Sequence, residues 1–152
     1  MKRYAEKTKV SPGNSKVEIE RILTRYGAGQ FAYGSGPKRA MVGFSIDRWY
    51  VRFILPLPDP KNKEFWRTPT GRTRGSDAAA QEYQQEIRRR WRALALTIKS
   101  KLETVASGIL TFDEEFMANI VLGDGQTIGQ HVLPKIEDYE MEKIPELLAL
   151  QE

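Results

Sequence analysis

Eight apolar residues in the second half of the chain recur at steps of three or four positions: Tyr83, Ile87, Trp91, Leu94, Ile98, Leu102, Val105 and Ile109. Because an α-helix turns about 100° per residue, this spacing confines all eight to one stripe about 100° wide. The stripe predicts a long amphipathic helix that begins at Ser76 or Asp77 and ends near Ser107. We expect this stripe to cover a β-sheet.

The preceding segment, from Gln30 to Leu57, alternates apolar and polar residues with a period of two. Such alternation is typical of half-buried β-strands. It predicts three strands, at 31–33, 40–46 and 49–55. A cluster of glycine, serine and proline at 34–38 predicts the turn between the first two strands.

Asp47 and Arg48 form a tight connection between the second and third strands, although neither is the glycine that favours a primed turn. The expected core pairs are Ile46 with Trp49, Phe44 with Val51, Val42 with Phe53, and Ala40 with Leu55. The same register places Tyr50 and Arg52 on the opposite face, near Ser45 and Gly43, with Arg39 further along. This second face is a candidate nucleic-acid contact, and the alternative is an exposed face covered by the N-terminal arm.

A first helix is predicted at 15–26, where Ser15 and Glu18 have the spacing of a capping box. Gly27 follows as a left-handed terminator. The arm before this helix, residues 1–14, is basic and has little to bury, so we expect it to be mobile.

The C-terminal part begins with another capping box, formed by Thr111 and Glu114. We expect a short helix through Ile120, a turn at 123–125, and one or two helices from about 129 to 150. Taken together, these segments predict an α+β fold. Its parts are an N-terminal helix, a three-stranded antiparallel sheet packed by one long helix, and a small C-terminal helical segment.

The chain is expected to form a single domain over residues 1–152, because no repeat, linker or low-complexity segment divides it. Its net charge of +4 is unevenly distributed. Residues 1–110, which contain the arm and a basic α-β-β-β-α core at 15–110, have 22 Lys and Arg against 10 Asp and Glu, a net charge of +12. Residues 111–152 have 2 against 10, a net charge of −8. This division favours a basic body that meets a polyanion; a solvated charged surface is the alternative.

Several classes of protein conflict with the composition. The chain has no cysteine and one histidine, His131, which we expect to be structural or exposed. Neither a disulfide framework nor a multi-histidine metal centre fits this composition. No apolar run reaches the roughly 20 residues that a membrane span needs, and the first residues lack a signal-peptide core. We therefore expect a cytoplasmic protein with no metal and no cofactor.

The connection at 56–75 contains prolines at 56, 58, 60 and 69, so little regular structure is expected there. It also concentrates positive charge, at Lys61, Lys63, Arg67, Arg72 and Arg74. Phe65 and Trp66 lie among these cations. Cations that contact phosphates and aromatic rings on which bases stack are the ingredients of single-strand binding. The alternative is that the two aromatic residues only attach the loop to the core.

A run of arginines at 88–92 surrounds Trp91 on the long helix. Helical geometry places Arg88 and Arg92 on one flank of the apolar stripe, whereas Arg89 points outward. These three residues are candidates for phosphate contacts. The alternative is a solvated face on which Glu82 and Glu86 partly neutralise the charge.

The chain contains no phosphate-binding loop, dinucleotide fingerprint, zinc-protease helix or nucleophile elbow. Asp59 with Lys61, and separately the acidic triplet 113–115, are the only pieces that would suit a magnesium-dependent nuclease. Their spacing supports neither. We therefore expect a binding protein rather than an enzyme.

Four segments resemble a group of uncharacterised bacteriophage and prophage proteins: 18–27, 48–58, 88–94 and 112–116. The order of helix, three strands, long loop and long helix also resembles the core of phage single-strand-annealing recombinases. In that family a groove between the sheet and the long helix holds single-stranded DNA. The resemblance implies a protein of the bacterial cytoplasm that acts in annealing or recombination.

The leading hypothesis is therefore sequence-independent binding of single-stranded nucleic acid. The predicted contacts are Arg39, Tyr50, Arg52, Lys61, Lys63, Trp66, Arg67, Arg72, Arg74, Arg88, Arg89 and Arg92, with Phe65 as a further stacking candidate. One alternative is an anti-defence factor that binds a host protein complex, and another is a nucleotide or signalling-ligand binder. Leu96, opposite the core stripe, predicts a second contact surface, either for another copy of the chain or for the C-terminal helices.

Overall fold

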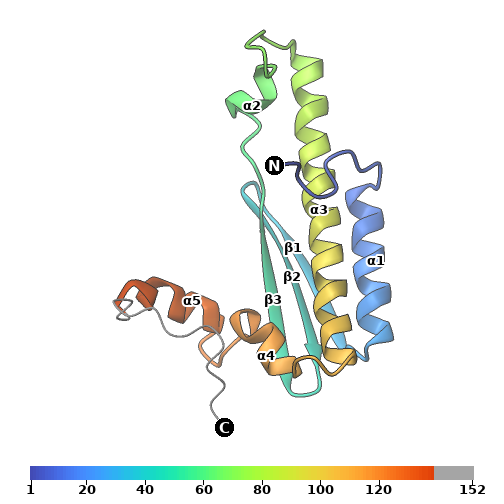
Figure 1. The fold of residues 1–152 in the computed structure, drawn as a ribbon, viewed down its shortest axis with the longest axis vertical. Coiled ribbons are helices and arrows are strands. Elements are labelled where there is room, and N and C mark those ends of the chain that lie inside the picture. Colours follow the sequence, from blue (N-terminus) through green and yellow to red (C-terminus); the bar gives the residue numbers. More distant parts are fainter. Residues whose placement is uncertain (139–152) are drawn as a thin grey trace.

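The computed structural model describes residues 1–138 and has the predicted α+β architecture (Figure 1). Its elements are α1 (Pro12–Arg25), β1 (Gln30–Ser35), β2 (Arg39–Ile46), β3 (Trp49–Pro56), α2 (Lys63–Trp66), α3 (Ser76–Ala106), α4 (Phe112–Phe116), η1 (Met117–Asn119), α5 (Ile128–Val132) and η2 (Leu133–Asp138). The sheet is antiparallel, with strand order β1-β2-β3. Among the described residues, no helix is both long and apolar enough to cross a membrane.

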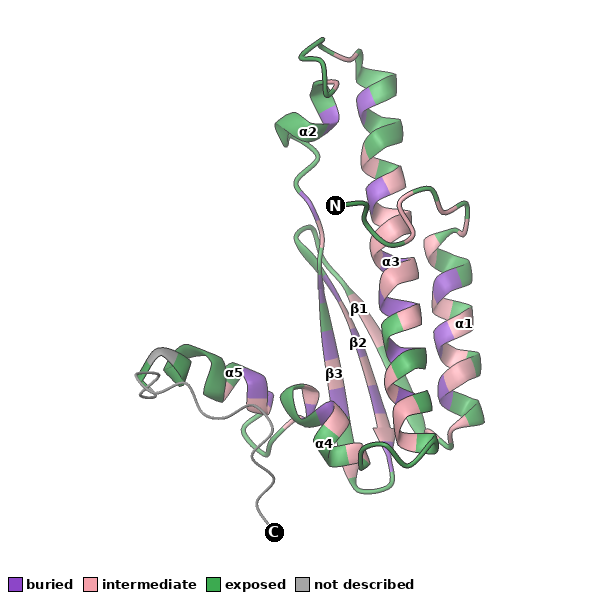
Figure 2. Ribbon diagram, viewed as in Figure 1, coloured by how far each residue is buried: buried purple, intermediate pink, exposed green. Residues whose placement is uncertain are grey.

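The apolar stripe of α3 packs on one face of the sheet, as the periodicity predicts. Trp91, Leu94, Ile98 and Leu102 are buried there. They share one core with the inward residues of β2 and β3 and with Ile19 and Leu23 of α1. Figure 2 shows these buried positions facing one another between the sheet and the helices. The prediction was wrong for Ile109, which is 71% exposed because the helix ends at Ala106.

The register of β2 and β3 is the predicted one, from Ile46 opposite Trp49 to Ala40 opposite Leu55. The tight connection is made without glycine because Asp47 adopts a left-handed conformation with a φ of 51°. Aspartate tolerates this region better than most residues. The core face and the outward face of the sheet are therefore assigned as the sequence predicts.

The start of the first helix differs from the prediction. Ser11, rather than Ser15, is the N-cap, and its Oγ accepts a hydrogen bond from the Asn14 N–H at 3.1 Å. Pro12 follows at the first helical position, where its missing N–H has no consequence. Ser15 is fully buried inside the helix. Glu18 forms an ion pair with Arg92 of α3 instead of closing a capping box.

The N-terminal arm lies against α3 and does not cover the outward face of the sheet. Gln85 Nε2 donates hydrogen bonds to the backbone oxygens of Glu6, at 3.1 Å, and Thr8, at 2.8 Å. Arg3 forms an ion pair with Glu86 at 3.2 Å. The expected mobility of the arm stays a prediction, but the alternative in which the arm covers the sheet is wrong for the described structure.

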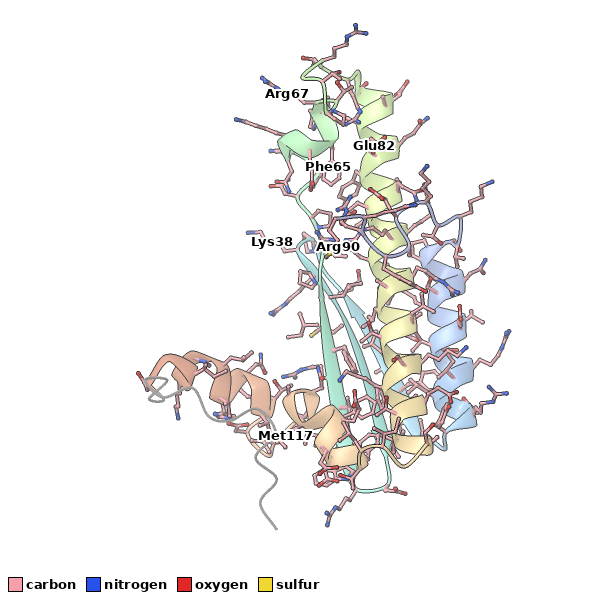
Figure 3. All side chains as sticks on the ribbon, viewed as in Figure 1. Lys38, Phe65, Arg67, Glu82, Arg90 and Met117 are labelled. Carbon is pink, nitrogen blue, oxygen red and sulfur yellow. The ribbon has the colours of Figure 1, made fainter. Side chains whose placement is uncertain are left out.

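The proline-rich connection is more ordered than the sequence predicts. It contains the single turn α2, and Phe65 of that turn is buried against Tyr83 of α3, with ring centroids 5.6 Å apart. A short antiparallel bridge joins Arg67 to Thr73. We call residues 61–74 the basic hook. Figure 3 shows Phe65 pointing from the hook toward α3, which anchors this segment beyond the end of the sheet.

The C-terminal segment is attached to the free edge of β3. The predicted capping box of Thr111 and Glu114 is present at the start of α4. Phe116 is fully buried, with its ring edge-on to Phe44 at 6.0 Å. The Val121 N–H donates to the backbone oxygen of Tyr50 at 2.8 Å, which adds a short extended piece to the sheet. The predicted helical continuation to residue 150 lies mostly outside the described residues.

Glu86 is the most buried carboxylate among the described residues, at 5% exposure. Its oxygens accept hydrogen bonds from Arg89, at 2.6 and 2.8 Å, and from Arg90, at 2.9 Å. Burial alone would raise the pKa of Glu86. The hydrogen bonds from the two arginines and the nearby charge of Arg3 outweigh burial and lower the pKa to about 2. Glu86 therefore holds three cations in place.

We predict that Glu86→Gln lowers the free energy of unfolding by about 3 kcal/mol at neutral pH, because the partly buried Arg89 and Arg90 and the half-exposed Arg3 lose their counter-charge. The folded pKa is below the ordinary value of 4.5, so the stabilisation is complete above about pH 4.5 and is lost as the pH falls toward 2. Urea unfolding at pH 7 and near pH 3 measures both effects. Glu82→Gln, at a half-exposed carboxylate, is the matched control and should change stability by less than about 0.5 kcal/mol. An equal loss for Glu86→Gln at both pH values would contradict this account.

Candidate nucleic-acid interface

The sheet has one covered and one open face. Helices α1 and α3 lie on one side of it, and the C-terminal segment reaches the other side only beside β3, where Arg52 bonds Gly125 and Gln130 (Figure 1). The positions that point to the open face are Gln30, Ala32 and Gly34 of β1, Arg39, Met41, Gly43 and Ser45 of β2, and Tyr50, Arg52 and Ile54 of β3. Tyr50 is 62% exposed. We call this surface the open face.

A groove of about 680 Å³ crosses the open face. Its floor is formed by small residues, Ala32, Gly43 and Ser45, and Tyr50 and Val121 stand at its margin. The volume falls within the range of roughly 300–1,000 Å³ that is common for ligand sites. The open face therefore offers a shallow, mostly apolar depression beside an exposed aromatic ring.

The three strands contain no acidic residue, so the charge of the open face is positive. Arg39 is exposed at one end of β2. Arg52 is only partly exposed, because its Nη2 donates to the Gly125 backbone oxygen at 2.8 Å and to Gln130 Oε1 at 3.0 Å. Arg52 thus anchors the C-terminal segment, while its charge stays beside the groove.

The basic hook presents four exposed cations: Lys61, Lys63, Arg67 and Arg72. Within residues 1–138, their side chains form no ion pair or hydrogen bond. Figure 3 shows Lys38, at the tip of the β1-β2 hairpin, pointing away from α3 in the region between the hook and the sheet. The hook and the open face lie on the same side of α3 (Figure 1), so their cations can contact one extended polyanion.

The two aromatic residues of the hook have different surroundings. Phe65 is buried against α3, so its predicted role as a stacking residue is wrong and the alternative of an anchor is confirmed. Trp66 is 37% exposed, and its Nε1 donates to the backbone oxygen of Pro60 at 2.9 Å. Trp66 and Tyr50 are therefore the two predicted aromatic contacts that remain accessible to a ligand.

Arg74 has a structural position inside the hook. Its Nη1 donates to the backbone oxygens of Glu64, at 3.0 Å, Phe65, at 3.3 Å, and Arg67, at 2.8 Å. These are the carbonyls that the single turn α2 leaves without helical partners. Arg74 closes the C-terminal end of α2 and holds the hook together.

The arginines at 88–92 are distributed around α3 and are paired within the protein. Arg88 bonds Gln85 at 2.7 Å, Arg89 bonds Glu86, and Arg92 pairs with Glu18 of α1. Arg52, Arg72, Arg74, Arg88 and Arg92 therefore do not converge in one groove. Two sets of predicted cations can be separated. Those exposed without an internal partner in the described residues are Arg39, Lys61, Lys63, Arg67 and Arg72, and those that bond within the protein are Arg52, Arg74, Arg88, Arg89 and Arg92.

The space between the arm, α2 and α3 bears on the nucleotide-clamp alternative. Arginine or lysine lines it at positions 3, 63, 67 and 74, and glutamate at positions 6, 64, 82 and 86. Equal numbers of cations and carboxylates leave this space without the positive potential that a phosphate clamp requires. The observation does not favour a nucleotide site here.

The acidic residues considered for a nuclease have local roles. Asp59 Oδ1 accepts a hydrogen bond from the Lys61 N–H at 2.8 Å, and Glu114 completes the capping box with Thr111. His131 Nε2 lies 2.7 Å from Asp124 Oδ2 on an exposed turn. Among the described residues, no three side chains of metal-binding type lie together in a metal-binding arrangement.

Sequence reasoning missed the groove as a site. It placed Gly43 and Ser45 near Tyr50 and Arg52 but assigned them no function. The available signal was a glycine in the middle of a strand, which often marks the close approach of a ligand or another backbone. Ala32 joins the same floor only through the pairing of β1 with β2.

No protein-family model, curated protein or solved structure matches this chain.

The two neighbouring arginines of the hook should behave differently when they are replaced. Arg74→Ala removes the hydrogen bonds to three backbone oxygens, so we expect the hook to open more often and chymotrypsin to cleave after its aromatic residues about tenfold faster. Arg72→Ala removes an exposed side chain and should leave the cleavage rate unchanged. Equal cleavage rates in the two variants would contradict the structural role of Arg74.

Proposed function

We propose that this protein binds single-stranded nucleic acid, without sequence preference, across the open face and along the basic hook. The observation that supports this most is the combination, on one side of α3, of a groove lined by no acidic residue and four exposed cations on the hook beyond the end of the sheet. Double-stranded DNA is too wide and stiff to lay its bases into such a shallow groove. The bases of a single strand, by contrast, can be unstacked and laid on a protein surface.

The contacts divide between phosphate and base. Lys61, Lys63, Arg67 and Arg72 neutralise phosphates, and Arg39 extends the positive surface onto the sheet. Tyr50 and Trp66 provide ring faces for bases, because stacking is tolerant of sequence. Five predicted contacts are removed from the proposed set because they bond within the protein: Arg52, Arg74, Arg88, Arg89 and Arg92. The resemblance to annealing recombinases extends this proposal to a role in annealing or recombination. The binding face would differ from that family, because the space between the sheet and α3 is filled here by the core.

Salt dependence tests the phosphate contacts. We expect the logarithm of affinity for a labelled single-stranded oligonucleotide to fall linearly with the logarithm of salt, with a slope of about −0.7 per neutralised phosphate. The double variant Arg67→Ala, Arg72→Ala should bind about tenfold more weakly and reduce the slope by about 1.4. Fluorescence anisotropy between roughly 50 and 200 mM salt measures both quantities.

The matched control is Arg21→Ala, Arg25→Ala, which removes two exposed arginines from α1, on the other side of α3. This control should bind as the wild type does. Affinity that is flat with salt, or an equal loss in both double variants, would contradict the proposed interface.

A protein partner is the second candidate, and a specific observation favours it. Several apolar side chains of the C-terminal segment are exposed among the described residues, including Met117, Leu133 and Ile136 at 53%, 64% and 45%. Exposed apolar side chains that form one patch are typical of protein contacts. A stoichiometric host protein that stays bound after nuclease treatment and is lost in Leu133→Asp would support this candidate. Oligonucleotide binding that is unaffected by Leu133→Asp would separate it from the leading proposal.

A further inference from the structure

The floor of the groove contains a glycine that the fold does not require. Gly43 lies in the interior of β2, the central strand, opposite Ala32 on one side and Arg52 on the other. Glycine in a strand interior is destabilising relative to alanine, because it loses more conformational freedom and packs no side chain. Its presence at the centre of this small sheet therefore calls for a physical reason.

Neither backbone geometry nor packing supplies that reason. Gly43 is absent from the glycines with a positive φ, so its conformation is open to any residue. A Cβ at this position would meet only the Val51 backbone oxygen, at 3.7 Å, which is an ordinary van der Waals distance. A larger side chain there would point from the open face into the groove and fill it. The lack of a side chain keeps the groove open.

The surroundings of Gly43 define what the groove can hold. The exposed ring of Tyr50 lies diagonally across from it, within the reach of an aromatic side chain between neighbouring strands. The walls are mostly apolar, and no carboxylate lies on the three strands. Arg52, opposite Gly43, is the cation that lines the groove, and Arg39 and the basic hook add positive charge further along, toward the other end of the sheet. A flat apolar ring attached to a polyanion matches this arrangement in shape and in charge.

We propose that the groove over Gly43 is a base-binding subsite, in which one unpaired base of the single strand lies flat on the floor and stacks against Tyr50. This inference rests on the proposed function and deepens it. The hook binds the strand through its phosphates, and the groove binds it through a base. The protein therefore distinguishes a single strand, whose bases are accessible, from other polyanions of equal charge.

The test compares two oligomers with the same number of phosphates, one of thymidine and one of abasic sugars, each about 12 nucleotides long. Wild-type protein should bind the thymidine oligomer about tenfold more tightly at equal salt. Gly43→Val, which fills the groove with a residue that favours strands, should abolish this preference. It should leave the affinity for the abasic oligomer and its salt slope unchanged.

Three further variants control for folding. Met41→Val changes the same face of the same strand two residues away, outside the groove lining, and should keep the preference. Tyr50→Ala removes an exposed ring that lies outside the core, and it should lose the preference for the thymidine oligomer. Tyr50→Phe keeps the ring and should keep the preference. Tyr50→Ala therefore tests the subsite even if Gly43→Val fails to fold, which thermal unfolding would reveal.

The outcomes separate the two proposals. If wild-type protein binds both oligomers equally, or if folded Gly43→Val and Tyr50→Ala both keep the full preference, the base subsite is overturned and sequence-independent phosphate binding stands. If wild-type protein binds neither oligomer, both the proposed function and the base-binding subsite are overturned.

Discussion

The packing of one long helix across one face of a three-stranded sheet determines the rest of this structure. Trp91, Leu94, Ile98 and Leu102 of α3 fill the core, and burial of apolar surface of this kind is the main stabilising contribution in a small domain. Because α1 lies beside α3, both helices pack on the same face of the sheet. The opposite face is left to small, basic and aromatic side chains, which is the arrangement on which the proposed function depends.

The length of α3 creates the second part of the interface. Its 31 residues span about 46 Å, whereas the longest strands, of 8 residues, span about 26 Å. The helix therefore extends beyond the sheet, and Phe65 and Arg74 attach the basic hook near this extension. The charged residues consequently have two roles. Glu86 pairs with the arginines close to the core, whereas Lys61, Lys63, Arg67 and Arg72 of the hook have no ion-pair partner in the described chain.

Much of the fold was predictable because its strongest patterns are local. The spacing of the α3 stripe and the alternation from Ala40 to Leu55 specify which faces must be buried, and the two-residue connection at Asp47 fixes the register. The start of α1 was not predictable, because Ser11 and Ser15 both suit an N-cap. The pairing of Arg92 with Glu18 joins residues 74 positions apart, so the sequence shows the charge but not its partner. The groove likewise exists only once β1 brings Ala32 beside Gly43.

The most direct test of the central claim is an amide NMR titration of the 17.4 kDa protein with a single-stranded oligonucleotide. The account predicts that the resonances that shift belong to the open face, including Ala32, Gly43 and Tyr50, and to the hook at 61–74. The resonances of α1 should not move. Shifts confined to α1 and the outer surface of α3, with the open face unchanged, would contradict it.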